Sequence, residues 1–210
     1  MRFNIVYWAG WSLTRIISKL VFRIKAEGRE NIPRKGGFIL ASNHISYYDP
    51  PLVGSWITRE LYFFAKKELF KNRLFGAVIR TTNSLPVNRQ GVDRQSIRLA
   101  VDAVNRGFGL TMFPEGTRSR TDEFLTPKPG LGMIASRAGC PIAVAYLHGS
   151  NKLKDCFWGR ERMSVTYGET FPAEWVKSFP AGKEGYQQIS EAVMERIGEL
   201  KAGVVSRQSA

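Results

Sequence analysis

The sequence predicts an α/β fold, a single domain whose mostly parallel central sheet is covered by helices, with an amphipathic helix at the N-terminus. Short apolar segments alternate with longer segments of helical periodicity, a pattern typical of a parallel sheet covered on both faces. The 210 residues, 43% of them hydrophobic and 23% charged, suit one folded domain with a sizeable core. No internal repeat or low-complexity linker divides the chain.

The first two dozen residues predict an amphipathic helix. The uncharged run from Phe3 to Thr14 is too short to span a bilayer, and the charges follow it, whereas a signal peptide begins with them. Arg15, Lys19 and Arg23 then recur at helical spacing. Such a helix fits an interfacial membrane anchor or a helix packed on its own domain, and the anchor is the favoured interpretation. The expected division is an interfacial helix at 1–24, the main domain at 25–202 and a flexible tail at 203–210.

Strands and helices alternate through the rest of the chain. Buried apolar runs bounded by turn residues predict strands at Phe38–Ser42, Leu61–Ala65, Ser84–Val87, Leu110–Phe113, Ile142–Leu147 and Ser164–Tyr167. Apolar residues at helical spacing predict helices at Pro51–Thr58, Leu74–Thr81, Val92–Arg106, Leu131–Ala138 and Tyr186–Lys201.

His44 and Asp49 are the candidate catalytic residues. His44 follows the first predicted strand, and Asp49 precedes two prolines, so it is expected to cap the next helix. Ligands of open α/β sheets bind at the carboxyl ends of the strands. A carboxylate bonded to one ring nitrogen would leave the other nitrogen to take a proton from a hydroxyl. The alternative is that His44 is a polar loop residue and Asp49 only a cap.

A second polar turn follows the fourth predicted strand. Gly116 in this turn allows a ligand to approach the backbone closely, and Arg118 can bind a phosphate bidentately. Glu115 can hold Arg118 or a substrate hydroxyl. Lys66 and Arg89 follow two other predicted strands and can add positive charge at the same edge. Each feature alone fits a solvated surface, but two polar turns at one sheet edge favour a site.

The net charge of +13, from 31 basic and 18 acidic residues, requires an anionic partner. Nucleic acid and anionic lipid are the usual choices, and the chain has no recognisable nucleic-acid module. Cys140 and Cys156 form no metal or redox motif and fit a reducing compartment. The sequence has no P-loop and no Gly-x-Ser-x-Gly elbow, and the second histidine, His148, ends an apolar strand and is interpreted as structural.

These residues together resemble the glycerolipid acyltransferase family, which includes bacterial 1-acylglycerol-3-phosphate acyltransferase. The family's Asn-His-x-Ser-x-x-Asp motif is complete at 43–49, and its Phe-Pro-Glu-Gly-Thr-Arg-Ser motif is complete at 113–119. Arg89 matches the arginine that ends the phosphate-binding block, and Lys66 is the closer match to the lysine block. The resemblance spans roughly residues 24–149.

The resemblance implies an enzyme, a 1-acylglycerol-3-phosphate O-acyltransferase of phospholipid biosynthesis. It would transfer an acyl group from acyl-carrier protein or coenzyme A to the sn-2 hydroxyl of lysophosphatidic acid, forming phosphatidic acid. Backbone amides near Gly116 would stabilise the tetrahedral oxyanion. The implied catalytic residues are His44 and Asp49, and the implied substrate-binding residues are Lys66, Arg89, Glu115, Gly116, Thr117 and Arg118.

The resemblance implies no metal and no cofactor beyond the thioester co-substrate. The expected partners are lysophosphatidic acid, the acyl thioester and an anionic membrane surface, with no nucleic acid. The expected location is peripheral and monotopic, at the cytoplasmic face of the cell membrane.

One departure from the family pattern leaves the acyl donor open. The fourth block usually has a second proline, whereas residues 141–145 read Pro-Ile-Ala-Val-Ala. Two alternatives to the main hypothesis remain. The acceptor can be another lyso-lipid, such as a lyso-ornithine lipid or a lysophospholipid. The chain can also be a non-catalytic basic protein that binds membranes or nucleic acid, although intact His44 and Asp49 argue against this.

Overall fold

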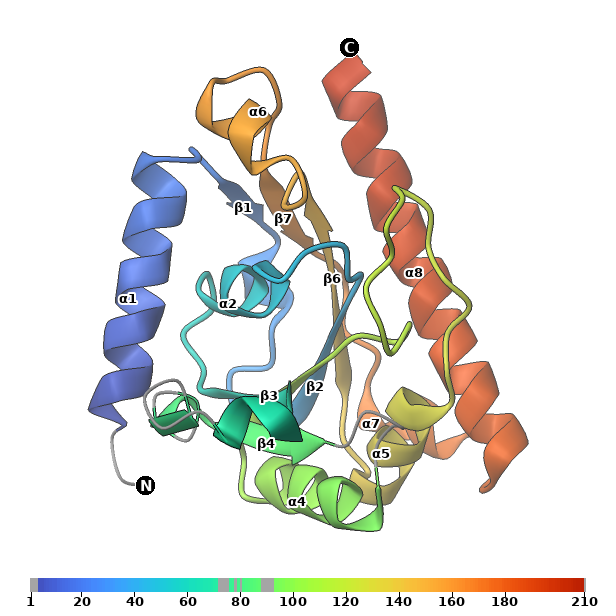
Figure 1. Cartoon of the computed structure of the whole chain (residues 1–210). Coiled ribbons are helices and arrows are strands. Elements are labelled where there is room, and N and C mark those ends of the chain that lie inside the picture. The colour runs from blue at the N-terminus through green and yellow to red at the C-terminus, as the bar shows by residue number, and fades with distance from the viewer. Residues whose placement is uncertain (1–3, 72–75, 78, 80, 88–92, 210) are drawn as a thin grey trace.

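The computed structural model describes residues 4–71, 76–77, 79, 81–87 and 93–209 and shows an α/β domain (Figure 1). Its described residues form a seven-stranded sheet in the order β1-β7-β6-β2-β5-β3-β4. Among the recorded pairings between these strands only β6–β7 is antiparallel, which confirms the predicted mostly parallel sheet. The strands are β1 (Lys25–Glu27), β2 (Phe38–Ser42), β3 (Leu61–Lys66), β4 (Ser84–Val87), β5 (Gly109–Met112), β6 (Ile142–His148) and β7 (Ser164–Tyr167).

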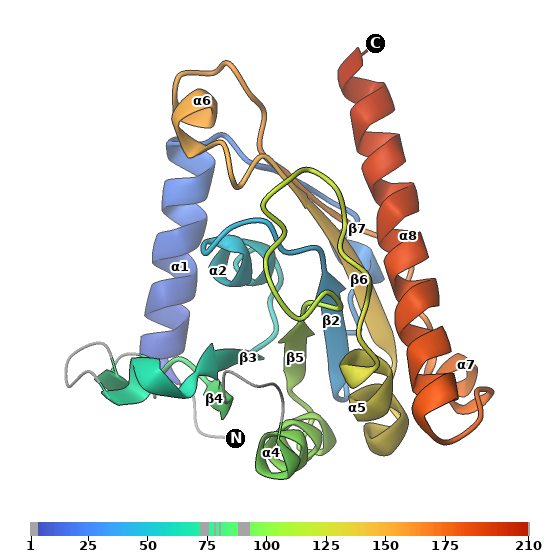
Figure 2. The ribbon, with the colours of Figure 1, turned by 45° about the vertical axis from the view of Figure 1, so that its right-hand side comes forward.

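Helices cover both faces of the sheet. Helices α1 and α2 pack together on one face, whereas α4, α5 and α8 lie on the other (Figures 1 and 2). The α-helices are α1 (Ile5–Leu20), α2 (Asp49–Gly54), α4 (Arg94–Asn105), α5 (Gly130–Ala138), α6 (Leu153–Phe157), α7 (Ala173–Lys177) and α8 (Lys183–Ser209). Two 3-10 helices, η1 (Arg29–Asn31) and η2 (Lys67–Lys71), complete the elements.

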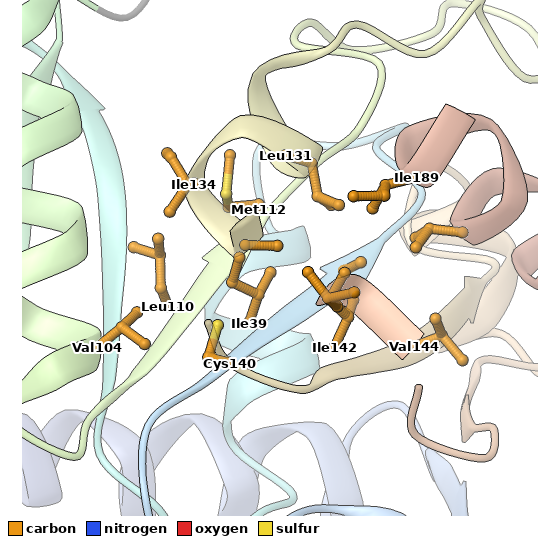
Figure 3. Packing of buried hydrophobic residues seen from close by; sticks show 14 of the residues in the cluster. Ile39, Val104, Leu110, Met112, Leu131, Ile134, Cys140, Ile142, Val144 and Ile189 are labelled. Carbon is orange, nitrogen blue, oxygen red and sulfur yellow. The ribbon is translucent and has the colours of Figure 1, made fainter. Parts of the chain in front are cut away.

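The central strand β2 divides the core into two layers. Ile39 and Ala41 pack against α4, α5 and α8 (Figure 3), and Phe38 and Leu40 belong to the second layer, with α2. Every residue of β2 is buried because side chains alternate between two covered faces. Burial on both faces holds the end of β2, and therefore the loop that follows it, in a fixed position.

Several element bounds differ from the sequence predictions. The bounds of β2, β4 and β7 are confirmed, whereas α2 ends at Gly54 and not at Thr58. Strand β1 and helices α6 and α7 were not predicted, because segments of three to five residues carry too little periodicity. The predicted helix at 74–81 falls partly outside the described residues, and its described residues 76, 77, 79 and 81 are helical.

The C-terminal segment from residue 203 is helical, whereas a flexible tail was predicted there. Helix α8 continues to Ser209, so the predicted end at Lys201 is wrong. Val204 is buried in the core layer, and Arg207 Nη1 lies 3.0 Å from Glu27 Oε2 on β1. These contacts stabilise the last turns, whose short sequence alone does not predict a helix.

Helix α1 is docked on the domain through its N-terminal half. Tyr7 is buried, and its hydroxyl accepts a hydrogen bond from Leu61 N at 3.0 Å. Trp8 Nε1 donates to Glu60 Oε1 at 3.0 Å, and Trp11 Nε1 donates to Ile57 O at 2.8 Å. The opposite face of α1 is exposed, so the helix is packed on its own domain and also presents an apolar surface.

Candidate active site

Four adjacent strands end at the site. Strands β2, β5, β3 and β4 are consecutive in the sheet and parallel, so the segments that follow them leave from one edge. His44 follows β2, Glu115 to Arg118 follow β5, and Lys66 ends β3. The prediction that these residues share one edge is confirmed. Arg89 lies outside the described residues.

His44 and Asp49 form a hydrogen-bonded pair. His44 Nδ1 lies 2.8 Å from Asp49 Oδ2, which leaves Nε2 as the ring nitrogen that can take a proton. The imidazole stacks on Phe113, with ring centroids 4.0 Å apart and an interplanar angle of 16°. The carboxylate and the aromatic ring together fix the orientation of the imidazole.

Asp49 is buried and accepts four hydrogen bonds. Besides His44 Nδ1, Oδ2 accepts the backbone N–H groups of Ile45 and Ser46 at 2.7 Å each, and Oδ1 accepts the Ser150 hydroxyl at 2.5 Å. The prediction that Asp49 caps the following helix is wrong. Helix α2 already includes Asp49, and the carboxylate points back to the N–H groups of its own loop. These donors hold the carboxylate of Asp49 in place beside the imidazole of His44.

Two further residues hold the loop and were not predicted as part of the site. Ser150, which donates to Asp49, is 101 positions away and carries no sequence signal for this contact. Asn43 extends the pairing of β2 with β6 through its side chain. Its Nδ2 donates to Leu147 O at 2.9 Å, and its Oδ1 accepts Leu147 N–H at 2.8 Å. Asn43 stood in the recognised motif, but its partner is visible only in the fold.

Glu115 joins the two motifs to each other. Its Oε1 accepts the backbone N–H of His44 and its Oε2 accepts that of Leu125, both at 2.9 Å. Burial raises the pKa of Glu115, whereas the N–H groups of Leu125 and His44 act to lower it. The residue is 1% exposed and positions the backbone of His44. Its expected contact with substrate stays a prediction.

Replacing Glu115 with glutamine is expected to lower the free energy of unfolding by about 1–3 kcal/mol. A carboxylate accepts two N–H groups, whereas a carboxamide must turn its NH₂ group toward one of them. Because His44 would shift, kcat is expected to fall while KM for the acceptor stays within about two-fold. Chemical denaturation and steady-state kinetics measure both effects, with the nearby exposed Glu123→Gln as the matched control. A large rise in KM with unchanged stability would instead indicate direct substrate contact.

The turn after β5 contains a glycine with positive φ, an exposed threonine and an arginine. Gly116 has φ +69°, a conformation that favours glycine, and its N–H donates to Phe113 O at 2.9 Å. That N–H is therefore engaged within the turn, and the amides near Gly116 that were expected to stabilise an oxyanion stay a prediction. Thr117 is exposed beside it. The Arg118 guanidinium lies 3.3 Å from the centroid of the exposed Tyr47 ring, which holds it next to the His44 loop.

Lys128 is a cation of this turn that the sequence reasoning missed. A Cβ placed on Gly116 would lie 3.4 Å from Lys128 Nζ, and Lys128 N–H donates to Pro114 O at 2.8 Å. Lys66 is exposed at the end of β3. Cations of three different segments, Lys66, Arg118 and Lys128, therefore belong to this edge of the sheet.

The two cysteines and the second histidine are the other side chains of types that often act in catalysis, and their surroundings differ from those of His44. Burial raises the pKa of Cys140 to about 12 and that of Cys156 to about 11, so both thiols stay protonated near neutral pH. His148 has Nδ1 3.4 Å from the Tyr146 hydroxyl and Nε2 3.4 Å from Glu161 Oε1, which supports its structural interpretation. Within the described ranges, no three His, Cys, Asp or Glu side chains are grouped so that they could hold a metal ion.

The fold and the site define a class of α/β enzyme in which a histidine–aspartate pair lies beside a turn with basic side chains at one sheet edge. Residues 23–147 match the family model described as Acyltransferase, so the chain belongs to the acyltransferase family. The resemblance drawn from the two motifs is thus confirmed.

Several known proteins are similar to this chain. The 1-acyl-sn-glycerol-3-phosphate acyltransferase of Bacillus subtilis (strain 168) is 29% identical over 188 residues, covering 89% of this chain and 92% of that protein. The lyso-ornithine lipid O-acyltransferase of Pseudomonas aeruginosa is 31% identical over 141 residues, covering 65% of this chain and 52% of that protein. The crystal structure of the 1-acyl-sn-glycerophosphate (LPA) acyltransferase PlsC from Thermotoga maritima has a TM-score of 0.69 and 28% identity, covering 96% of this chain and 84% of that one.

Proposed function

We propose that this acyltransferase converts lysophosphatidic acid to phosphatidic acid, with an acyl thioester of acyl-carrier protein or coenzyme A as the donor and no metal or other cofactor. The observation that carries the proposal is the His44 pair. Asp49 engages Nδ1, and Nε2 is left to take a proton from a hydroxyl that the substrate brings. Such a pair suits transfer to an alcohol.

The reaction then proceeds by direct attack. His44 Nε2 takes the proton of the sn-2 hydroxyl while its oxygen bonds to the thioester carbonyl carbon. The negative charge of Asp49 stabilises the imidazolium that forms. The tetrahedral intermediate collapses, the carbon–sulfur bond breaks, and the thiolate takes the proton from His44. The products are the ester and the free thiol.

An acyl-enzyme intermediate has little support at this site. The hydroxyl of Ser150 donates to Asp49, and that of Ser119 donates to Glu123 O at 2.7 Å. Both thiols have pKa values raised well above neutrality. A hydroxyl or thiol attacks a thioester efficiently only when a base activates it, and these groups lie in other hydrogen bonds. The substrate hydroxyl is therefore the nucleophile.

The cations at the edge would bind the phosphate of the acceptor. Arg118 has the planar fork that matches a phosphate, and Lys66, Lys128 and Arg89 would add charge. The Bacillus and Thermotoga relatives carry lysophosphatidate acyltransferase names, which supports this acceptor. The Pseudomonas relative, named for a lyso-ornithine lipid, keeps another lyso-lipid as the second candidate.

Replacing Arg118 with glutamine is expected to raise KM for lysophosphatidic acid by roughly ten-fold, with a smaller effect on kcat. Arg118→Lys keeps the charge but not the fork, and its KM should lie between the two. Arg137→Gln, an exposed cation on α5, is the control and should leave KM unchanged. Equal KM values for Arg118→Gln and the unaltered chain would remove Arg118 from the phosphate site.

A panel of acceptors tests the proposed function. The purified protein is incubated with lysophosphatidic acid, a lyso-ornithine lipid or a lysophospholipid, each with both donor types, and the products are identified by mass spectrometry. Phosphatidic acid formed from lysophosphatidic acid is the expected result. Product from another lyso-lipid alone would move the acceptor to that class. No product with any acceptor would favour the non-catalytic binding protein.

We also propose that α1 holds the enzyme peripherally on an anionic membrane at the cytoplasmic face. Among the described helices, none is long and apolar enough to cross a membrane. The face of α1 opposite the docked aromatics exposes large apolar side chains, namely Ile5, Val6, Leu13, Ile16, Ile17 and Leu20. Lys19 and Arg23 are exposed beside them, whereas Arg15 lies over the rings of Trp11 and Trp56. An apolar face with flanking cations suits the interface of an anionic bilayer.

The triple variant Leu13→Ser, Ile16→Ser, Leu20→Ser is expected to bind anionic vesicles at least ten-fold more weakly, because it removes exposed apolar area and no packed contact. Deleting the helix would also remove buried Tyr7, so substitution is the sharper test. Vesicle co-sedimentation measures the effect, with Leu99→Ser on α4 as the control. Unchanged binding by a folded triple variant would show that α1 is only a packing helix.

A further inference from the structure

The segment at the end of α6 exposes two large aromatic side chains. Phe157 is 52% exposed and Trp158 is 71% exposed, and their rings pack edge to face with centroids 5.2 Å apart. All five tryptophans of the chain are described, and the other four are buried or half-buried. Buried Cys156 holds the helix against the core layer of α2. The exposed pair is thus presented on a fixed support and is not covered by its own domain.

This pair lies at the active-site edge and beside the end of α1. Helix α6 follows β6, which is parallel to β2 and ends at the same edge as His44. Lys25, just after α1, pairs with Ser164 at the start of β7, and a Cβ placed on Gly159 would lie 3.7 Å from Arg23 Nη1. Both views show α6 next to the C-terminal end of α1 (Figures 1 and 2).

Exposed cations lie close in sequence to the two aromatic residues. Lys154, Arg160 and Arg162 are exposed within a few positions of them. Two acidic residues are nearby. Glu161 Oε2 lies 3.1 Å from Lys152 Nζ, and no ion pair of Asp155 is recorded among the described residues. Aromatic rings flanked by cations match the interfacial region of an anionic bilayer, where rings enter the head-group layer and cations meet lipid phosphates.

We propose that Phe157 and Trp158 form a second membrane anchor, which binds the surface of an anionic bilayer together with the exposed face of α1. This proposal rests on the proposed peripheral binding through α1. A single helix lying in the interface can still rotate about its own axis. A second contact at the end of that helix fixes the rotation, so that the edge carrying His44 faces the lipid from which the acceptor comes.

An acidic carrier protein is the competing occupant of this basic surface. The two exposed aromatics and their continuity with the apolar face of α1 favour the bilayer. The two occupants predict different effects of the same substitutions, because a carrier protein affects only reactions that use it as donor.

The test compares Phe157→Ser/Trp158→Ser with the conservative Trp158→Phe and with the control Leu99→Ser. Each full-length protein is sedimented with vesicles of equal parts phosphatidylcholine and phosphatidylglycerol. Acyl transfer is measured in parallel with a short-chain acceptor dissolved as monomers, using the coenzyme A donor and the acyl-carrier protein donor separately. Quenching of tryptophan fluorescence by brominated lipids, compared between the unaltered chain and Trp158→Phe, gives a second measurement that does not depend on folding of the double variant.

The double variant is expected to bind vesicles more weakly by about ten-fold or more. Vesicle binding by Trp158→Phe and Leu99→Ser is expected to stay close to that of the unaltered chain. Activity on the monomeric acceptor stays unchanged with both donors, and Trp158→Phe loses part of the quenching by brominated lipids. Unchanged vesicle binding, or quenching identical in Trp158→Phe and the unaltered chain, overturns the proposal. So does a loss confined to the acyl-carrier protein donor. Inactivity of the unaltered chain with every acceptor would reject the proposed function and leave the vesicle result to decide the anchor.

Discussion

Replacing His44 with alanine is expected to lower the rate of acyl transfer by about 100- to 10,000-fold. The loss follows because Nε2 is the group that takes the substrate proton and no other recorded contact places a base there. The fold is expected to persist. The His44 side chain is at the edge of the sheet, stacks on Phe113 and lies outside both core layers. Single-turnover kinetics with lysophosphatidic acid measure the loss, and thermal unfolding checks the fold.

His148→Ala is the matched control for this prediction. Both ring nitrogens of His148 face protein groups, Tyr146 and Glu161, so its removal should leave most of the activity. Near-normal transfer by a folded His44→Ala protein would contradict the assigned base. A comparable loss in His148→Ala would indicate that the His44 effect is a general disturbance of this sheet edge.

Asp49→Asn is expected to lower kcat by about 100-fold or more while the protein stays folded. The asparagine oxygen can take the Oδ2 position, facing His44 and the two backbone N–H groups, and its NH₂ group can donate to Ser150. The hydrogen-bond geometry is therefore largely kept. What is lost is the negative charge that stabilises the imidazolium as the proton moves.

Ser150→Ala separates the charge of Asp49 from its positioning. This variant keeps the carboxylate and removes one of its four donors, so we expect a smaller decrease in kcat, about ten-fold. Steady-state kinetics and thermal unfolding of both variants provide the comparison. A larger loss in Ser150→Ala than in Asp49→Asn would show that position, and not charge, is the main contribution of Asp49.

The sequence located the active edge because each motif directly follows an apolar strand. The run Phe38–Ser42 could be recognised as a buried strand, and in a parallel sheet its end must lie beside the ends of the neighbouring strands. His44, Asp49 and the turn at Gly116 could therefore be placed together without knowing the strand order. The predicted anion site followed from arginine and lysine at the ends of other strands.

The roles of the buried carboxylates could not be predicted in the same way. Asp49 before two prolines has the pattern of a helix cap, yet its carboxylate turns back to Ile45, Ser46 and Ser150. Glu115 was expected to meet substrate, yet its two carboxylate oxygens accept hydrogen bonds from the backbone N–H groups of His44 and Leu125. Ile45 and Ser46 are near Asp49 in sequence, but the Ser150 hydroxyl is 101 positions from Asp49, and the His44 N–H is 71 positions from Glu115. Only the fold brings these two distant donors to the carboxylates.

The same reason explains the helix at 203–209. Its short sequence, with two valines between glycine and polar residues, carries no clear helical periodicity, but Val204 packs into the core and Arg207 reaches Glu27 near the other end of the chain. Tertiary contacts determine this element, as they do the short strand β1. Local patterns predict elements well only where the element itself carries the periodicity.

The intact mass of the protein after exposure to the acyl donor alone tests the central claim most directly, that His44 serves the hydroxyl of the substrate and not one of the protein. The protein is mixed with an acyl thioester without acceptor, quenched and weighed by mass spectrometry, and lysophosphatidic acid is then added to a parallel sample. We predict an unmodified protein in the first sample and phosphatidic acid in the second. A protein heavier by one acyl group, which transfers that group when the acceptor is added, would contradict direct transfer.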